Sequence, residues 1–255
     1  MGRWQTERVE GVTVVTMTSN KVNAMDTDFC SDLQAAIAEL QSSEPTPVVL
    51  TGTGRCFSAG LDILALYELD RTTLASFVDR LNESLLAWFT FPRPTVAAVN
   101  GHAIAGGCVL ALACDLRIAC DGGGRIGLNE VQVGIPLPCV PLEIARHALS
   151  PERIREVLLA GALYAPTEAR ARGLVDEVVE PDALLARAVA AARTIAFDSL
   201  EAYARIKAHL LAPAVARVTE GRARINREFL DVWFSEPGQR QLGAVRQRLL
   251  ERSRE

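Results

Sequence analysis

The sequence predicts an α/β domain whose strands pair in parallel, and three observations support this. Short β-branched runs alternate with segments of helical period, two of these strand-to-helix units follow the same residue order, and the chain after about residue 150 is mainly helical. With 255 residues, of which 49% are hydrophobic, the chain can bury a large core. We therefore expect one large domain, or one domain with an appendage.

The first predicted strand covers residues 9–17, where side chains alternate and many are β-branched. A helix is then expected from an Asp26 cap through Leu40. Its apolar residues recur every three or four positions and make one buried face: Phe29, Leu33, Ala36, Ile37 and Leu40.

Two similar units follow. Residues 47–52 predict a short buried strand that ends in a glycine-containing loop, and a helix begins near Asp62. Residues 94–101 repeat the pattern, with a loop that reaches Ala105-Gly106-Gly107 and an apolar helix after it. In both units a proline is followed by a β-strand run, a polar residue, a glycine, a loop, an Ala-Gly pair and a helix, in that order. Both units should therefore build a strand-to-helix turn of the same kind.

A third strand is expected at Leu116–Ala119, and a loop leads from it to residues 126–130. Residues 181–211 and 218–252 are rich in Ala, Leu and Arg and predict helices, which we expect Pro213 and Pro237 to interrupt. Because no low-complexity linker precedes these helices, they should pack on the core or on a neighbouring subunit.

Composition excludes several classes of function. The net charge is −4, so the basic excess that drives nucleic-acid binding is missing. The most apolar stretch, residues 95–114, is broken by polar residues and glycines, which excludes a membrane span. Residues 4–8, Trp-Gln-Thr-Glu-Arg, precede any apolar run, which argues against a signal or transit peptide. We expect a cytoplasmic protein with neither nucleic-acid nor membrane partners.

The six cysteines stand mostly in apolar segments and never form a CxxC pair. They are Cys30, Cys56, Cys108, Cys114, Cys120 and Cys139. Reduced, buried thiols are the expected state, and no metal site is expected.

The two strand-to-helix turns are the candidate chemical feature, because P-loop, HExxH, GxSxG and dinucleotide motifs are absent. Such turns leave backbone N–H groups unpaired at a helix start. Two such donors that converge on one oxygen form an oxyanion hole, which polarises a thioester carbonyl and stabilises the enolate formed from it. From the residues alone, the turns can equally be tight packing corners.

Four ordered motifs cover nearly the whole chain and resemble the enoyl-CoA hydratase/isomerase (crotonase) superfamily. They are RCFSAGLD (55–62), PTVAAVNGHAIAGGCVLALACD (94–115), IGLNEVQVGI (126–135) and YAPTEARARGLVDEV (164–178). The resemblance implies a crotonase-like spiral of ββα repeats in residues 1–197 and a C-terminal helical trimerisation region in residues 198–255. It also implies a homotrimer or a dimer of trimers.

The same resemblance implies an acyl-CoA thioester substrate, which carries its own coenzyme A, so no separate cofactor is expected. The oxyanion hole would consist of the N–H groups of Leu61 and Gly106. The thioester and pantetheine path would be lined by Ser58, Ala59, Gly60, Leu61, Asp62, Gly106 and Asn129.

One of the two acidic positions of the family is filled. Hydratases carry a glutamate just after the Gly-Gly-Cys of the second turn, where this chain has Val109, while Glu130 occupies the other position. Water addition normally uses two carboxylates, whereas one carboxylate is enough to move a proton. The chain therefore resembles the Δ3,Δ2-enoyl-CoA isomerases of fatty-acid β-oxidation, with Glu130 as the proton shuttle and a dienolate held in the hole.

Three alternatives stay open: an enoyl-CoA hydratase or other lyase, a non-catalytic acyl-CoA-binding homologue, and, less favoured by the charge, an RNA-binding crotonase scaffold. His102 is expected to be a packed turn residue, and Asp62 should cap or brace the first turn. The remaining large apolar residues of interest should be core: Met17, Met25, Trp88, Phe89 and Phe91. The proline-dense stretch 136–141 replaces a glycine-rich one in many relatives and should reshape the acyl pocket wall.

Overall fold

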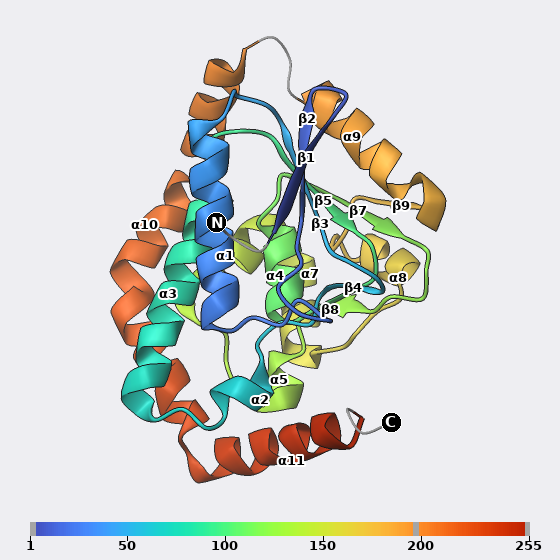
Figure 1. Cartoon of the computed structure of the whole chain (residues 1–255). Helices are drawn as coiled ribbons and strands as arrows, with labels where there is room; N and C mark the ends of the chain where they lie inside the picture. The colour runs from blue at the N-terminus through green and yellow to red at the C-terminus, as the bar shows by residue number, and fades with distance from the viewer. Residues whose placement is uncertain (1–3, 196–198, 253–255) are drawn as a thin grey trace.

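The larger sheet has six strands in the order β1-β2-β3-β5-β7-β9 (Figure 1). The structure is a computed structural model, and it describes residues 4–195 and 199–252. The strands are β1 (Gln5–Val9), β2 (Val12–Thr16), β3 (Val48–Thr51), β5 (Thr95–Val99), β7 (Leu116–Cys120) and β9 (Glu177–Val179). Only the β1–β2 pair of this sheet is antiparallel. A second sheet consists of three parallel strands, β4 (Cys56–Ser58), β6 (His102–Ile104) and β8 (Ile126–Gly127). The predicted α/β class with parallel pairing is confirmed.

The prediction of a single strand over residues 9–17 is wrong, because this segment contains the end of one strand and the whole of the next. Strand β1 ends at Val9 and β2 begins at Val12, and the two residues between them, Glu10 and Gly11, have φ of 48° and 81°. Positive φ at both positions is typical of the two-residue hairpin turn. Because alternation continues through so short a turn, the pattern looked like one strand.

Each repeat of the chain gives one strand to each sheet and then a helix. Strands β3 and β4 precede α2 (Ile63–Leu66) and α3 (Arg71–Phe89), β5 and β6 precede α4 (Gly106–Leu112), and β7 and β8 precede α5 (Glu130–Val133). This is the expected spiral of ββα repeats. The residue pattern predicts loops where β4 and β6 lie, because strands of three residues are too short to show a period.

The inner strands of the larger sheet, β2, β3, β5 and β7, are buried on both faces, whereas β1 is mostly exposed. Helix α9 (Leu184–Ile195) packs against Val12 and Val14 on one face, whereas Val15 and Met17 face the main core under α1 (Thr27–Ser42), α3 and α4 (Figure 1). Burial on both faces explains why the strands read as nearly continuous apolar runs. The expected core residues are buried, among them Met17, Met25, Trp88, Phe89 and Phe91. All six cysteines are free and buried, as predicted.

The second half of the chain is helical. Besides β9 and α9, its elements are α6 (Cys139–Ala148), α7 (Pro151–Ala160), α8 (Pro166–Ala171), the 3₁₀ turn Pro181–Ala183, α10 (Leu200–Trp233) and α11 (Glu236–Arg252). Pro237 lies in the first turn of α11, where its missing N–H has no helical partner. Pro213 was expected to interrupt a helix, and that prediction is wrong, since α10 continues through it. Burial of Leu211 and Ala214 on either side holds the helix against the core at this point.

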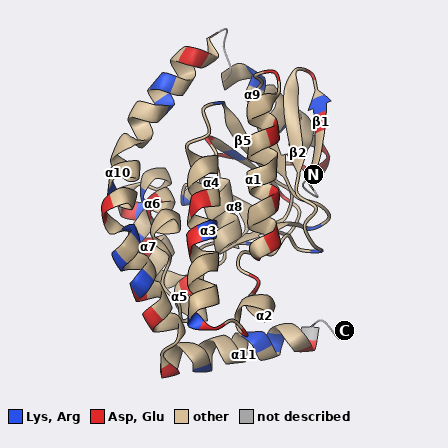
Figure 2. Cartoon of the chain, turned by 60° about the vertical axis from the view of Figure 1, so that its left-hand side comes forward, with Lys and Arg blue, Asp and Glu red and all other residues tan. Residues whose placement is uncertain are grey.

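Charged residues of both signs are distributed along the outer helices α10 and α11 (Figure 2). Pairs one turn apart, such as Arg224–Glu228 and Arg240–Glu236, are exposed and add little stability. Among the described residues, no helix is both long and apolar enough to cross a membrane. The predicted boundary between residues 197 and 198 falls outside the described part of the chain. Trimerisation through the C-terminal helices stays a prediction.

Candidate active site

The two strand-to-helix turns lie side by side because the strands that lead into them pair. Strands β4 and β6 are parallel neighbours, with Ser58 opposite Ala103. The turns that follow touch through glycines: a Cβ on Gly60 would lie 2.7 Å from the Ile104 carbonyl oxygen and 2.9 Å from the Gly106 nitrogen. The fold thus brings the two helix starts within contact distance, as the resemblance implied.

Leu61 and Gly106 both keep a backbone N–H free. Met25 N–H donates to the Gly60 carbonyl at 2.7 Å, and Asp62 N–H donates to the Met25 carbonyl at 3.0 Å, which fixes the peptide groups around Leu61. Within residues 4–195 and 199–252, neither the Leu61 nor the Gly106 amide has a hydrogen-bond acceptor. Both residues line the same cavity.

The second turn is held in an unusual backbone conformation. Ala105, which precedes α4, has φ 51° and ψ −122°, a strained combination for a residue with a Cβ. Its N–H donates to the Gly127 carbonyl at 2.8 Å, and its carbonyl accepts from Val109 N–H at 3.0 Å. These two bonds hold the peptide group that presents the Gly106 amide.

We expect Gly60→Ala to destabilise the protein by about 2–3 kcal/mol and to lower its activity, because φ is +79° and the new Cβ meets backbone atoms that cannot move aside. Gly54→Ala is the matched control. Gly54 also has positive φ, +59°, but a Cβ there has no atom within 4 Å. It should cost only about 1 kcal/mol and keep full activity. Denaturant unfolding and kcat separate the two variants, and equal effects would contradict the close contact of the two turns.

Ser58, Ala59 and Asp62 have different places in the first turn. Ser58 is fully buried, does not line the cavity, and its hydroxyl donates to the Asn23 carbonyl at 2.7 Å. Ala59 lines the cavity. Asp62 also lines it, but its Oδ1 accepts from Ala65 N–H at 3.0 Å and caps α2, as predicted. Ser58 and Gly60 therefore shape the turn from behind the cavity wall.

Glu130 is the first residue of α5 and is 7% exposed. Its Oε2 atom is buried and has no hydrogen-bond partner among the described residues. Burial raises the pKa of this carboxyl to about 7. Unlike a packed structural glutamate, it is therefore held close to equal populations of acid and base near neutral pH.

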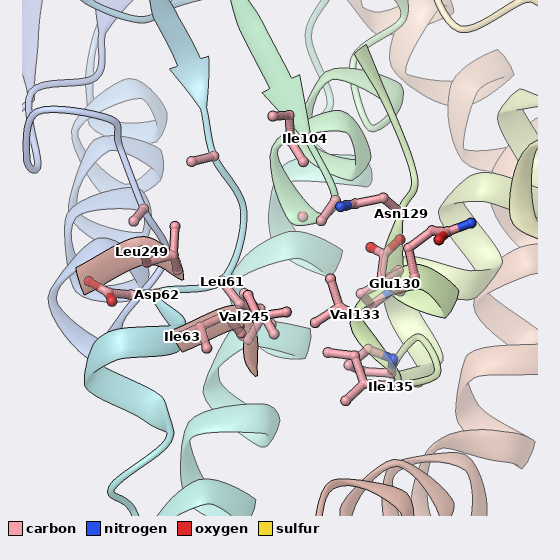
Figure 3. Close-up of a pocket in the computed structure, with 18 of the residues that line it drawn as sticks. Leu61, Asp62, Ile63, Ile104, Asn129, Glu130, Val133, Ile135, Val245 and Leu249 are labelled. Atoms are coloured by element: carbon pink, nitrogen blue, oxygen red, sulfur yellow. The ribbon is translucent and has the colours of Figure 1, made fainter. Parts of the chain in front are cut away.

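Asn129 lies next to Glu130 in the cavity wall (Figure 3). Its Oδ1 atom is also buried, again with no partner in the described chain. Two neighbouring polar atoms without protein partners are rare in a folded interior, and both can be satisfied by a bound molecule or water.

The cavity that joins these groups has a volume of about 610 Å³. Leu61, Ile63 and Val245 lie on one side of it, and Glu130, Val133 and Ile135 lie on the other (Figure 3). Its only lining carboxylates within the described residues are Asp62 and Glu130. Because Asp62 caps a helix, Glu130 is the one acid in this wall without a structural task.

The other candidate acids and bases lie elsewhere. Val109 is fully buried in α4 and does not reach the cavity, so no acid stands at that position. His102 lies in strand β6 and not in a turn, and its Nδ1 accepts from Arg125 N–H at 3.1 Å. Burial, with the nearby Arg55 and Arg125, lowers the His102 pKa. Among the described residues no cluster of metal ligands occurs.

Some cavity residues were not identified from the sequence. Helix α11 contributes Val245, Arg248 and Leu249 to the lining (Figure 3). Val245 and Leu249 stand four residues apart and so share one face of the helix. That spacing marks an apolar face, but which surface the face covers depends on tertiary packing.

Comparisons with known proteins agree on one family of proteins. The sequence profile of the family "enoyl-CoA hydratase/isomerase" matches residues 7–246. A putative enoyl-CoA hydratase of Thermus thermophilus is 36% identical over 197 residues, which cover 74% of this chain and 76% of that protein. The mitochondrial enoyl-CoA delta isomerase 1 of Mus musculus is 32% identical over 188 residues, 72% of this chain, and the match spans 65% of the mouse protein, less than two thirds of its length.

Solved structures agree in fold over nearly the whole chain. The crystal structure of human mitochondrial delta3-delta2-enoyl-CoA isomerase gives a TM-score of 0.92 at 28% identity and covers 98% of this chain and 99% of its own. An enoyl-CoA hydratase from Bacillus halodurans gives 0.84 at 25% identity, with coverage of 94% and 99%. Similar proteins therefore carry both hydratase and isomerase names. The choice between these two activities has to come from the acidic residues of the cavity.

Proposed function

The chain belongs to the enoyl-CoA hydratase/isomerase family, and we propose that it is an isomerase that converts 3-enoyl-CoA into trans-2-enoyl-CoA. The observation that carries this proposal is the single free carboxylate of the cavity. Glu130 has an unpartnered oxygen and a pKa near neutrality. The other acid of the cavity wall, Asp62, caps α2, and the alternative acidic position is the buried Val109.

In the proposed reaction, the Glu130 carboxylate removes a proton from C2 of the bound 3-enoyl thioester. The electron pair left behind spreads over C2, C4 and the thioester oxygen, which becomes the enolate oxygen of a dienolate. The amides of Leu61 and Gly106 donate to that oxygen and stabilise its charge. Protonated Glu130 then returns the proton at C4, so the double bond moves to C2–C3 and the carboxylate is regenerated.

The raised pKa suits both halves of this cycle. A carboxylate of pKa 4.5, the ordinary value for glutamate, is a weak base, whereas one near 7 removes a proton more readily and is still protonated easily. Burial in an apolar wall is the cause of the shift. An acyl chain bound against the same wall would displace water from the carboxylate and from the dienolate.

Hydration is the second candidate, because the Thermus thermophilus relative carries a hydratase name at 36% identity. Addition of water to a 2-enoyl-CoA needs one group to activate the water and another to protonate C2, and the two tasks are normally divided between two carboxylates. Glu130 alone can serve only one of them at a time. A non-catalytic acyl-CoA-binding protein would need neither the shifted pKa nor the unpartnered oxygen.

The assay compares the two reactions on one preparation. With a 3-enoyl-CoA, the absorbance of the conjugated thioester should appear, and with a trans-2-enoyl-CoA, its loss through hydration should be much slower. The kcat/KM for isomerisation should rise with pH and level off above a midpoint near 7, because only the ionised form of Glu130 can take the first proton. Faster hydration, or a midpoint near the ordinary glutamate value, would contradict the proposal.

A further inference from the structure

Met25 lies behind the cavity wall and touches both strand-to-helix turns. It is fully buried and does not line the cavity. Its backbone forms a parallel bridge with Leu61, in which Met25 N–H donates to the Gly60 carbonyl at 2.7 Å and the Met25 carbonyl accepts from Asp62 N–H at 3.0 Å. The Gly60–Leu61 peptide is planar and trans, so a carbonyl turned toward Met25 turns the Leu61 N–H away from it. The backbone of Met25 thus sets the direction of one of the two free amides.

The side chain of Met25 reaches the other turn. A Cβ placed on Gly106 would lie 2.9 Å from Met25 Sδ and 3.7 Å from Met25 Cε, so the thioether fills the space beside the Gly106 backbone. The Cα of Gly60 lies 3.5 Å from the same position. Since the Gly106 N–H donates to no acceptor in the described part of the chain, the α4 backbone and packing contacts of this kind determine where it lies.

The segment that carries Met25 is anchored independently of the Met25 side chain. Asn23 Nδ2 donates to the Phe57 carbonyl at 3.1 Å, and the Ser58 hydroxyl donates to the Asn23 carbonyl at 2.7 Å. These bonds hold the segment along β4 and the first turn. A change of the Met25 side chain should therefore keep the backbone bridge and alter mainly the contact with Gly106.

We propose that Met25 is a positioning residue of the oxyanion hole, whose thioether holds the Gly106 amide at the distance from the Leu61 amide that one thioester oxygen requires. A donor displaced by about 1 Å loses much of its effect on the enolate. Methionine suits this place, because its unbranched thioether adapts to an irregular gap. The inference rests on the proposed function only in that it assigns both amides to the thioester oxygen, and it does not depend on isomerisation as the outcome.

The kinetic test compares Met25→Ala with Met17→Ala. Met17 is equally buried in the same core, but its backbone bonds to β3, with Met17 N–H donating to the Thr51 carbonyl at 2.8 Å. Both truncations empty the space of one methionine side chain and should lower the urea midpoint by similar amounts. Only Met25→Ala should lower kcat with a 3-enoyl-CoA, by about tenfold to a hundredfold, with little change in KM.

Two further substitutions at position 25 sharpen the comparison. Met25→Leu refills most of the space and should restore kcat to within about threefold of the wild type. Met25→Val removes the δ and ε atoms but leaves a smaller void than alanine. It should show the kcat loss of Met25→Ala, and it carries the test if the alanine protein does not fold.

A vibrational measurement separates this inference from the proposed function. In the Glu130→Gln background, the stretching frequency of an isotope-labelled carbonyl in a bound saturated acyl-CoA reports how strongly the two amides polarise the thioester, without turnover. The band should lie below its position in water, stay there when Met17→Ala is added, and return toward the water value when Met25→Ala or Met25→Val is added.

This band pattern supports the role of Met25 even if no variant isomerises a 3-enoyl-CoA, in which case only the proposed reaction fails. If the Met25 and Met17 truncations give the same band and the same kcat, the positioning role is overturned. A band at the water value in every protein overturns it as well, since the two amides then do not bind the carbonyl.

Discussion

Replacing Glu130 with glutamine should lower kcat for isomerisation by about 10²- to 10⁴-fold, the range that general acid–base groups contribute. The amide has nearly the shape of the carboxyl group but cannot accept the proton from C2. KM should change little, since the thioester is held by the Leu61 and Gly106 amides and by the apolar wall. Steady-state kinetics with a 3-enoyl-CoA measures both quantities.

The same substitution should stabilise the protein at alkaline pH. The folded-state pKa of Glu130, about 7, lies above its value of 4.5 in an unfolded chain, so the native state holds the extra proton between these values and stability falls as pH rises through that window. The difference, 7 − 4.5, corresponds to at most about 3 kcal/mol above pH 7. Glutamine carries no charge and avoids this cost, so urea unfolding at about pH 8 should show a more stable variant.

Glu143→Gln is the matched control for both effects. Glu143 is 1% exposed, but its carboxylate is paired, with Arg146 Nη1 at 2.6 Å and Arg217 Nε at 2.5 Å. Loss of its charge should destabilise the protein and leave the chemistry intact. If the Glu130→Gln protein keeps its activity, Glu130 is not the proton shuttle. A Glu130→Gln protein as unstable as the control would mean that Glu130 has a structural partner.

Deleting one amide donor of the oxyanion hole should lower kcat by about 10²- to 10³-fold. The clean change is to place the α-hydroxy analogue of leucine at position 61, which replaces the N–H with an ester oxygen and keeps the side chain. The Leu61 amide has no acceptor in the described chain, so the native fold loses no hydrogen bond there. Kinetics and thermal unfolding together separate catalysis from stability.

The control for the ester is the same replacement at Leu64. This leucine lies in α2, one turn beyond Leu61, and also lines the cavity. Its ester should keep nearly full kcat, because the Leu64 amide belongs to the helix and not to the turn. Equal losses at the two positions would show that the ester disturbs the turn and that Leu61 N–H has no separate role.

Much of this architecture could be predicted because local patterns determine it. The β-branched runs identified strands of the larger sheet, and Asp26 and Asp62 cap helices as expected. The repeated strand-to-helix turn indicated two helix starts of the same kind, which lie side by side. Errors arose where tertiary structure overrides local preference. The two-residue hairpin kept the alternation of one strand, and burial of Leu211 and Ala214 carries α10 through Pro213.

The chemical site was predictable only in part. The resemblance implied Glu130, Leu61 and Gly106, and all three line one cavity. The raised pKa of Glu130 was not predictable, since it depends on which apolar side chains surround the carboxyl group. For the same reason, the contribution of α11 to the cavity required the packed structure. It depends on contacts between segments more than a hundred residues apart along the chain.

The most direct test is a crystal structure of the protein with a bound substrate analogue, such as a saturated acyl-CoA. We expect the thioester oxygen to lie within about 3 Å of the backbone nitrogens of both Leu61 and Gly106. The Glu130 carboxylate should lie close to both C2 and C4 of the acyl chain. A thioester oxygen that contacts neither amide, or a Glu130 side chain turned away from those two carbons, would contradict the proposed mechanism.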